Sequence, residues 1–225
     1  MIRFDYAPDV VARFPTIRHS VVEARGVANG AAARRLADEY HAEQRMAAER
    51  ARTEPVAERP AIAAWRRVFR DFGTDPTQHR SAPEALLRRV TKHGDIPPIN
   101  AAVDVGNLVS IRHSLPVAVF DLAKLVGGIT VVFAAGSESF DAIGTTVGSR
   151  PDPGEVIFVD DSKTVLARRW CWRQSTAAAV TERTTSIAYV VEAHHGTAAI
   201  DVDDAASAID DLLRRHLRPG EVQRR

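Results

Sequence analysis

The stretch INAAVDVGNLVSIRHSLPVAVFD, residues 99–121, is the part of this 225-residue chain that best indicates its fold. Its centre, from Val103 to His113, is compatible with a helix that ends before Pro116, because proline cannot continue a helix. The apolar run 117–120 that follows is typical of a buried strand. A buried amide has to find hydrogen-bond partners. Asn107 is therefore either a ligand-binding residue or is bonded to a neighbouring loop.

A second stretch, residues 160–195, carries further polar groups that suggest a site. Its segment RRWCWRQ mixes guanidiniums, which pair with phosphates, and indoles, which stack on bases at an RNA end. The candidate RNA-binding residues are Arg168, Arg169, Trp170 and Arg173. The alternative is one arginine in a salt bridge and two tryptophans in the core. We expect this stretch to meet residues 99–121 across one cavity.

Glu192 ends the apolar strand pattern IAYVVE. A carboxylate at this point is either a solvated charge at the end of a strand or a selector inside the cavity. His194 and His195 follow directly, and adjacent residues on a strand point to opposite faces. They are therefore a poor metal pair, and we expect no metal site.

Composition and charge narrow the functional classes. Hydrophobic residues make up 45% of the chain and charged residues 26%, as in ordinary globular proteins, and the net charge is only +1. The overall charge does not favour DNA or a membrane, so an RNA site has to be a local arginine patch. The single cysteine, Cys171, excludes an intrachain disulfide. We expect a cytoplasmic protein without a signal peptide, a membrane span or a cofactor motif.

The remaining pattern predicts an α+β fold, because helices come first and strands come later. Ser81 and Glu84 predict a capping box at the start of one helix, which ends at Gly94. The C-terminal residues 221–225 are expected to be frayed. Helices are also predicted at 29–53, 61–72 and 204–217, and strands at 17–24, 129–134, 156–159, 164–168 and 187–192.

Three segments of the sequence resemble the B3/B4 domain of the bacterial phenylalanyl-tRNA synthetase beta subunit. They are PPINAAVDVGNLVSIRHSLPVAVFDLAKLVGGITVVFA, VIFVDDSKTVLARR and TTSIAYVVEA. The motifs NLVS, LPVAVFDL and RRWxxRQS are closer to the free-standing bacterial version of this domain. The resemblance implies a B3/B4-type domain over residues 80–195 with a mixed-sheet core. Residues 1–79 then add an N-terminal strand and helices, and residues 196–225 add a C-terminal helix and tail.

In the synthetase this domain edits, which means that it hydrolyses tyrosine mischarged onto the phenylalanine tRNA. By this resemblance Asn107 takes the place of the asparagine in the family's TNY motif, and Gly106 takes the place of its threonine. Ala118 stands where the family has a histidine. Glu192 matches the glutamate that recognises the tyrosine hydroxyl, if two extra residues are allowed in the preceding strand. Asn107, Glu192, Gly106 and Ala118 are thus the candidate substrate-binding residues, with Asn107 the candidate for positioning water.

Two functions follow from the resemblance. The first is a free-standing editing-type hydrolase that cleaves the ester of a misacylated aminoacyl-tRNA. The second is a module that binds an amino acid or an RNA 3′ end without turnover, which the absence of the histidine at Ala118 favours. A third, weaker interpretation is a degenerate domain that only holds partners together.

Overall fold

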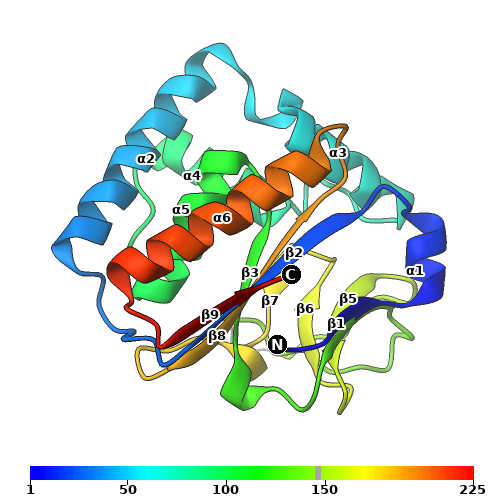
Figure 1. The fold of residues 1–225 in the computed structure, drawn as a ribbon. Helices are drawn as coiled ribbons and strands as arrows, with labels where there is room; N and C mark the ends of the chain where they lie inside the picture. The colour runs from blue at the N-terminus through cyan, green and yellow to red at the C-terminus, as the bar shows by residue number, and fades with distance from the viewer. Residues whose placement is uncertain (145–147) are drawn as a thin grey trace.

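The computed structural model describes residues 1–144 and 148–225, and its strands form two sheets. The four-stranded sheet is antiparallel in the order β3-β8-β2-β9. The five-stranded sheet has the order β1-β4-β5-β6-β7 and is mixed, because β1 and β4 run parallel (Figure 1). The strands are β1 Phe4–Tyr6, β2 Arg18–Arg25, β3 Val117–Asp121, β4 Ile129–Phe133, β5 Val156–Asp160, β6 Val165–Arg168, β7 Arg173–Gln174, β8 Ser186–Ala193 and β9 Glu221–Arg224.

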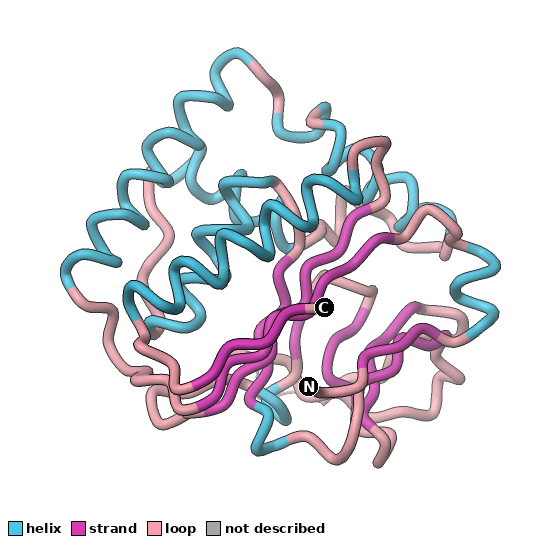
Figure 2. Tube along the Cα trace, in the orientation of Figure 1, coloured by secondary structure: helices cyan, strands magenta, loops and turns pink. Residues whose placement is uncertain are grey.

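The longer helices gather on one side of the four-stranded sheet, and the five-stranded sheet lies on its other side (Figure 2). The helices are α1 Pro8–Arg13, α2 Arg34–Thr53, α3 Pro60–Asp71, α4 Ala82–His93, α5 Ala101–His113 and α6 Ala198–His216, with 3₁₀ turns at Val56–Glu58, Leu122–Lys124 and Thr176–Ala178. The expected α+β class with a mixed sheet is confirmed. No helix in the described part of the chain combines the length and the apolar character that crossing a membrane requires.

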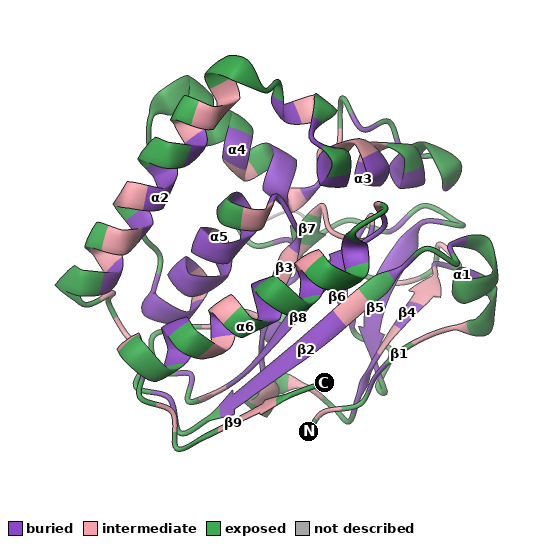
Figure 3. Ribbon diagram, turned by 45° about the horizontal axis from the view of Figure 1, so that its top comes forward, coloured by how far each residue is buried: buried purple, intermediate pink, exposed green. Residues whose placement is uncertain are grey.

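Side chains alternate along β8 between the two faces of the four-stranded sheet, one facing the helices and the other facing the five-stranded sheet. Tyr189 and Val191 belong to the core beneath the helices, whereas Val190 belongs to the core between the two sheets. This is the period of two that a strand imposes. It places Glu192 on the side of the five-stranded sheet, together with Ala118 of β3. Figure 3 shows that β2, the strand beside β8, is buried along most of its length.

Helix α5 has a defined start and end. The side chain of Asn100 caps its N-terminus by accepting a hydrogen bond from the Val103 amide at 3.1 Å. Ser114 ends it in the left-handed conformation with φ 58°. In between, Gly106 lets the helix approach β3 closely, because a Cβ at this position would stand 2.7 Å from Cγ2 of Val119.

Several expected boundaries differ from the structure. Helix α2 begins at Arg34 rather than at residue 29, and α6 begins at Ala198 rather than at residue 204. The predicted capping box at the start of α4 is wrong. Ser81 is the N-cap residue, but its side chain makes no capping bond. Glu84 is instead engaged by Arg66 and Arg88 at 2.8 and 2.9 Å.

The C-terminal tail is a strand and not a frayed end. Strand β9 pairs antiparallel with β2 from Val22↔Arg224 to Arg25↔Glu221. The backbone of Arg225 adds two hydrogen bonds to Val21, of 2.8 and 3.0 Å. This pairing covers the edge of β2, which would otherwise expose unpaired backbone groups.

The close approach at Gly106 can be tested with threonine, the residue that the resemblance implies at this position. We expect Gly106→Thr to lower the free energy of unfolding by about 2 kcal/mol, because β-branched atoms would be forced into Val119. Gly196→Thr is the matched control, since nothing lies within 4 Å of a Cβ at that exposed position. Urea denaturation of both variants measures the difference. Equal stabilities would contradict the close packing of α5 on β3.

Candidate functional site

A cavity of about 530 Å³ opens beside β3, where α4 and α5 meet the two sheets. Both stretches singled out in the sequence line it, 99–121 and 160–195, so the structure brings them together as expected. Its polar side chains are Arg89, Asn107, Arg173, Gln174 and Glu192. The walls are mostly apolar, with Leu86, Ile96, Val103, Val117, Val119, Phe158 and Val180 among them. Its volume lies within the range of small-molecule sites.

Glu192 is the carboxylate of this cavity, and its side chain is almost fully buried, at 2% exposure. Its Oε1 accepts hydrogen bonds from the Tyr6 hydroxyl at 2.6 Å and from the Trp170 indole at 2.9 Å. Burial raises the pKa of Glu192 to about 7, and the two donors offset part of that rise. Glu192 is therefore not a solvated charge at a strand end, and it changes its protonation state near neutral pH.

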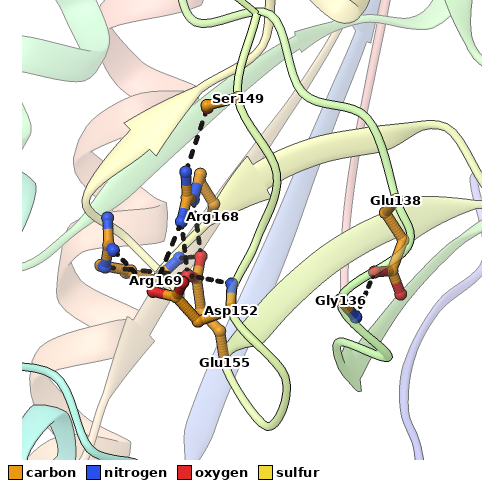
Figure 4. A network of polar contacts seen from close by, with 7 residues as sticks. All are labelled: Gly136, Glu138, Ser149, Asp152, Glu155, Arg168 and Arg169. Atoms are coloured by element: carbon orange, nitrogen blue, oxygen red, sulfur yellow. Dashed lines mark hydrogen bonds and ion pairs between the residues drawn. The ribbon is translucent and has the colours of Figure 1, made fainter.

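A strained turn delivers Trp170 to Glu192. Arg169 and Trp170 follow β6 with φ of 44° and 59°, a conformation that residues other than glycine rarely adopt. The carboxylate of Glu155 holds the turn, because its Oε1 accepts the Arg169 backbone N–H at 2.7 Å (Figure 4). The backbone N–H of Trp170 bonds to the carbonyl of Val156 at 2.7 Å. Strain of this kind persists only where the surroundings enforce it.

The same network changes the interpretation of the two adjacent arginines. Arg168 is buried and makes a two-pronged contact with Glu155, with bonds of 2.9 and 2.8 Å (Figure 4). Arg169 donates to Asp152 at 2.9 Å. Neither arginine lines the cavity. Their guanidiniums are thus engaged by carboxylates within the protein, and the structure gives them the role of holding the turn rather than that of free phosphate contacts.

The exposed side of the cavity carries one expected cation, Arg173, and one that was not expected, Arg89. Arg173 lines the cavity and is exposed, and its guanidinium lies 4.9 Å from the ring centre of Trp172. Arg89 of α4 is also an exposed lining residue, and the sequence did not single it out. Ile99 and Ile143 line the same cavity at 61% and 51% exposure. These four residues, Arg89, Ile99, Ile143 and Arg173, are called the rim below.

Trp170 and Trp172 occupy different environments. Trp170 is fully buried at 0% exposure, among Phe14, Trp65 and His194, and its indole N–H donates to Glu192. Trp172 is half-buried and lines the cavity near the rim. Of the two tryptophans, Trp172 is the one suited to stacking on a ligand.

Asn107 lines the cavity from α5 and also approaches the hydroxyl of Tyr40 from α2. Burial raises the pKa of Tyr40, the nearby carboxylate of Asp104 raises it further, and Asn107 opposes both effects. Asp104 is completely buried, and its Oδ1 accepts the backbone N–H of Ile99 at 2.9 Å. Asp104 thus holds the segment that leads into α5, while Asn107 lies between the cavity and Tyr40.

The two positions at which the family residues are missing differ in location. Ala118 lines the cavity, so its small side chain leaves space beside Glu192. Gly106 is not among the lining residues and instead faces Val119, Tyr189 and Val117. Gly106, which the resemblance made a candidate substrate-binding residue, thus packs α5 against β3 and does not line the cavity.

The other reactive groups near the cavity are poorly suited to catalysis. Burial raises the pKa of the Cys171 thiol well above its usual value, so the thiolate is disfavoured. His194 is buried, and burial lowers its pKa to about 3, so it stays neutral. Among the described residues no group of three histidine, cysteine or acidic side chains is placed to hold a metal ion.

Sequence reasoning missed Tyr6, because a tyrosine in a short N-terminal strand has no motif around it. It also missed Gln174, whose Nε2 donates to the carbonyl of Val119 at 3.1 Å and which lines the cavity. The exposed Arg89 belongs to one of several arginine pairs in the helices, and nothing in its local sequence distinguishes it from the others. Only its position one turn from Leu86, another lining residue, could have indicated it.

The buried carboxyl of Glu192 makes stability depend on pH. Its pKa is about 7 in the folded state and near 4.5 when exposed, so the folded state binds the extra proton between these values and stability falls as pH rises. We expect Glu192→Gln to gain stability relative to wild type from pH 4.5 to pH 8, by about 3 kcal/mol. His194 acts in the opposite direction but is present in both proteins. Denaturant unfolding across this pH range measures the difference, and a constant difference would contradict a buried, titrating Glu192.

The sequence of this chain is similar to those of known proteins. The family model of the B3/4 domain matches residues 64–218. The phenylalanine–tRNA ligase beta subunit of Nocardia farcinica is 35% identical over 112 residues, which are 49% of this chain and 13% of that protein. The beta subunit of Cereibacter sphaeroides is 36% identical over 83 residues, or 36% of this chain and 10% of that protein.

A solved structure covers almost the whole chain at low identity. It is an N-terminal fragment of the phenylalanyl-tRNA synthetase beta subunit from Pyrococcus horikoshii, with a TM-score of 0.49 and 10% identity. The matched region is 97% of this chain and 49% of the fragment. The chain spans only about a tenth of the length of the curated relatives. Since the family model matches more than half of the chain, the protein belongs to the B3/4 domain family.

Proposed function

We propose that this chain hydrolyses the ester of a misacylated aminoacyl-tRNA. The observation that carries the proposal is the cavity that has the buried carboxyl of Glu192 at its inner end and two exposed arginines, Arg89 and Arg173, at its rim. Membership of the B3/4 family supports it, since relatives with this domain are beta subunits of phenylalanine–tRNA ligases. Acting on tRNA would place the protein in the cytoplasm.

The depth of burial indicates how a ligand would lie. Glu192 and Trp170 are buried, so they form the inner end, whereas Arg89 and Arg173 are exposed at the rim. An amino-acid side chain with an apolar body fits the apolar walls, and a hydrogen-bond donor at its tip reaches Glu192. The ester and the RNA end then lie toward the rim, where arginine contacts phosphate and Trp172 stacks on a base.

The reaction needs little covalent help from the protein, because the ester is already activated. Holding the substrate and one water molecule in a productive orientation supplies a large share of the rate. Asn107 is the residue that we assign to this task, since its amide both donates and accepts hydrogen bonds and lines the cavity. Charge that develops on the ester oxygen would be stabilised by the same amide.

The alternative is a binding module for an amino acid or an RNA 3′ end that does not turn over. Two observations favour it: Ala118 supplies no base to the cavity, and burial raises the pKa of the Cys171 thiol. Both functions use the same residues, and only release of the amino acid separates them.

The proposal is tested with a panel of charged and mischarged tRNAs and the purified chain. We expect one class of aminoacyl-tRNA to be deacylated, and we expect Asn107→Ala to lower that rate about a hundredfold, as loss of one donor at a developing charge does. Release of labelled amino acid is the measurement. Ser207→Ala, an exposed change on α6, is the control that should keep the wild-type rate.

Two outcomes count against the proposal in different ways. If no tRNA is deacylated at high enzyme concentration but amino acids raise the melting temperature saturably, the binding module replaces the hydrolase. If Asn107→Ala deacylates at the wild-type rate, hydrolysis stands and the assignment of Asn107 falls.

The rim makes a separate prediction about RNA affinity. We expect Arg173→Ala to weaken tRNA binding and to lower the slope of log affinity against log salt by about 0.7, the value for one phosphate contact on a single strand. Arg214→Ala is the matched control, because Arg214 lies on α6 in an ion pair with Asp210 and outside the cavity. Filter binding at several salt concentrations gives both slopes. Equal slopes for the two variants would exclude Arg173 from the RNA contact.

A further inference from the structure

We propose that Tyr6 is a positioning residue for the cavity carboxyl: its hydroxyl holds Oε1 of Glu192, so that Oε2 is the oxygen presented to a ligand. The inference rests on the proposed function in one respect, that Glu192 contacts the ligand. Tyr6 itself is not a lining residue of the cavity. It acts through Glu192, to which its hydroxyl donates at 2.6 Å.

The ring of Tyr6 is fixed from several sides. Strand β1 pairs in parallel with β4, with Tyr6 opposite Val131, and this pairing sets its backbone. Its ring packs edge-on against Phe4 at 5.4 Å and against His19 at 5.2 Å, measured between ring centres. The Trp170 ring lies 6.4 Å away. A phenol held in this way loses little further freedom when it binds Glu192.

The arrangement around the carboxyl is asymmetric. Tyr6 lies at the end of β1, and Trp170 lies in the turn after β6. Both nevertheless donate to the same oxygen of Glu192, Oε1. A carboxylate whose one oxygen is engaged by two donors has a defined orientation, with its second oxygen free to accept from a ligand. One ligand donor can then be recognised at Oε2 without competing with the protein.

The other titratable groups that face Glu192 do not supply a charge partner. His19 stands opposite Glu192 in the register of β2 and β8, and burial lowers its pKa. Cys171 has a raised pKa and His194 a lowered one, so both are neutral near pH 7. Among the described residues no lysine or arginine forms an ion pair with Glu192. Burial, opposed by the two hydrogen bonds, therefore sets the pKa of this carboxyl, without a counter-ion.

Tyr6 lies outside the region that the family model matches, which begins at residue 64. The N-terminal strand of this chain thus completes the inner end of a cavity that the B3/4 region otherwise forms. Removing the Tyr6 hydroxyl would leave the carboxylate form of Glu192 with one donor fewer, and the neutral form would gain by comparison.

The test is a ¹³C NMR titration of the chain labelled at glutamate side-chain carboxyl carbons. Glu192→Gln assigns the Glu192 signal by its loss. We expect a wild-type midpoint near 7 and a midpoint about one pH unit higher in Tyr6→Phe, the shift that loss of one hydrogen bond to a charged group produces. Tyr189→Phe is the matched control, because Tyr189 lies on β8 as Glu192 does. Its buried hydroxyl donates to the carbonyl of Ala102 on α5 and not to Glu192.

The outcomes separate this inference from the proposed function. A midpoint that rises in Tyr6→Phe and stays at the wild-type value in Tyr189→Phe supports the role of Tyr6. In a plot of deacylation rate against pH, the midpoint of the acid limb should then also move to higher pH in Tyr6→Phe. An unchanged midpoint in Tyr6→Phe, or an equal rise in both variants, overturns it. If wild type deacylates no tRNA, the proposed function fails, while the carboxyl titration still decides the role of Tyr6.

Discussion

The burial of the Glu192 carboxyl between the two sheets is the constraint that organises the site. A carboxylate without water needs hydrogen-bond donors, and burying it without them would cost several kcal/mol or force it to stay neutral. Here two donors reach Oε1, from Tyr6 at the N-terminus and from Trp170 in the turn after β6. Segments far apart in the sequence are thus tied to one atom, and the cavity lies beside it.

The indole donor, Trp170, reaches Glu192 through a turn with two left-handed residues. This turn depends on the buried ion pair of Glu155 and Arg168. Glu155 stabilises this turn by accepting from the backbone of Arg169 and by pairing with Arg168 through both of its oxygens. An ion pair of this kind contributes more to geometry than to net stability, since both charges lose their hydration. The arginine pair of the sequence therefore supports the site from behind and does not line it.

The sequence allowed much of this arrangement to be predicted, and the failures have physical reasons. Periodicity located the helix and the strand of residues 99–121, but it left open whether Glu192 is a solvated charge or lies inside the cavity. The capping box failed because Glu84 is drawn to two arginines from α3 and α4. Strand β9 and the donor Tyr6 depend on contacts with distant segments, which no local pattern records.

The two departures from the family motif that the resemblance implies, at Gly106 and Ala118, have different structural consequences. Ala118 faces the cavity and changes what a ligand meets. Gly106 faces β3, where a Cβ would stand 2.7 Å from Val119, so the packing of α5 leaves no room for the family's threonine. Asn107, the next residue on α5, does line the cavity. Packing at Gly106 and lining by Asn107 thus divide two neighbouring positions of α5 between the core and the cavity.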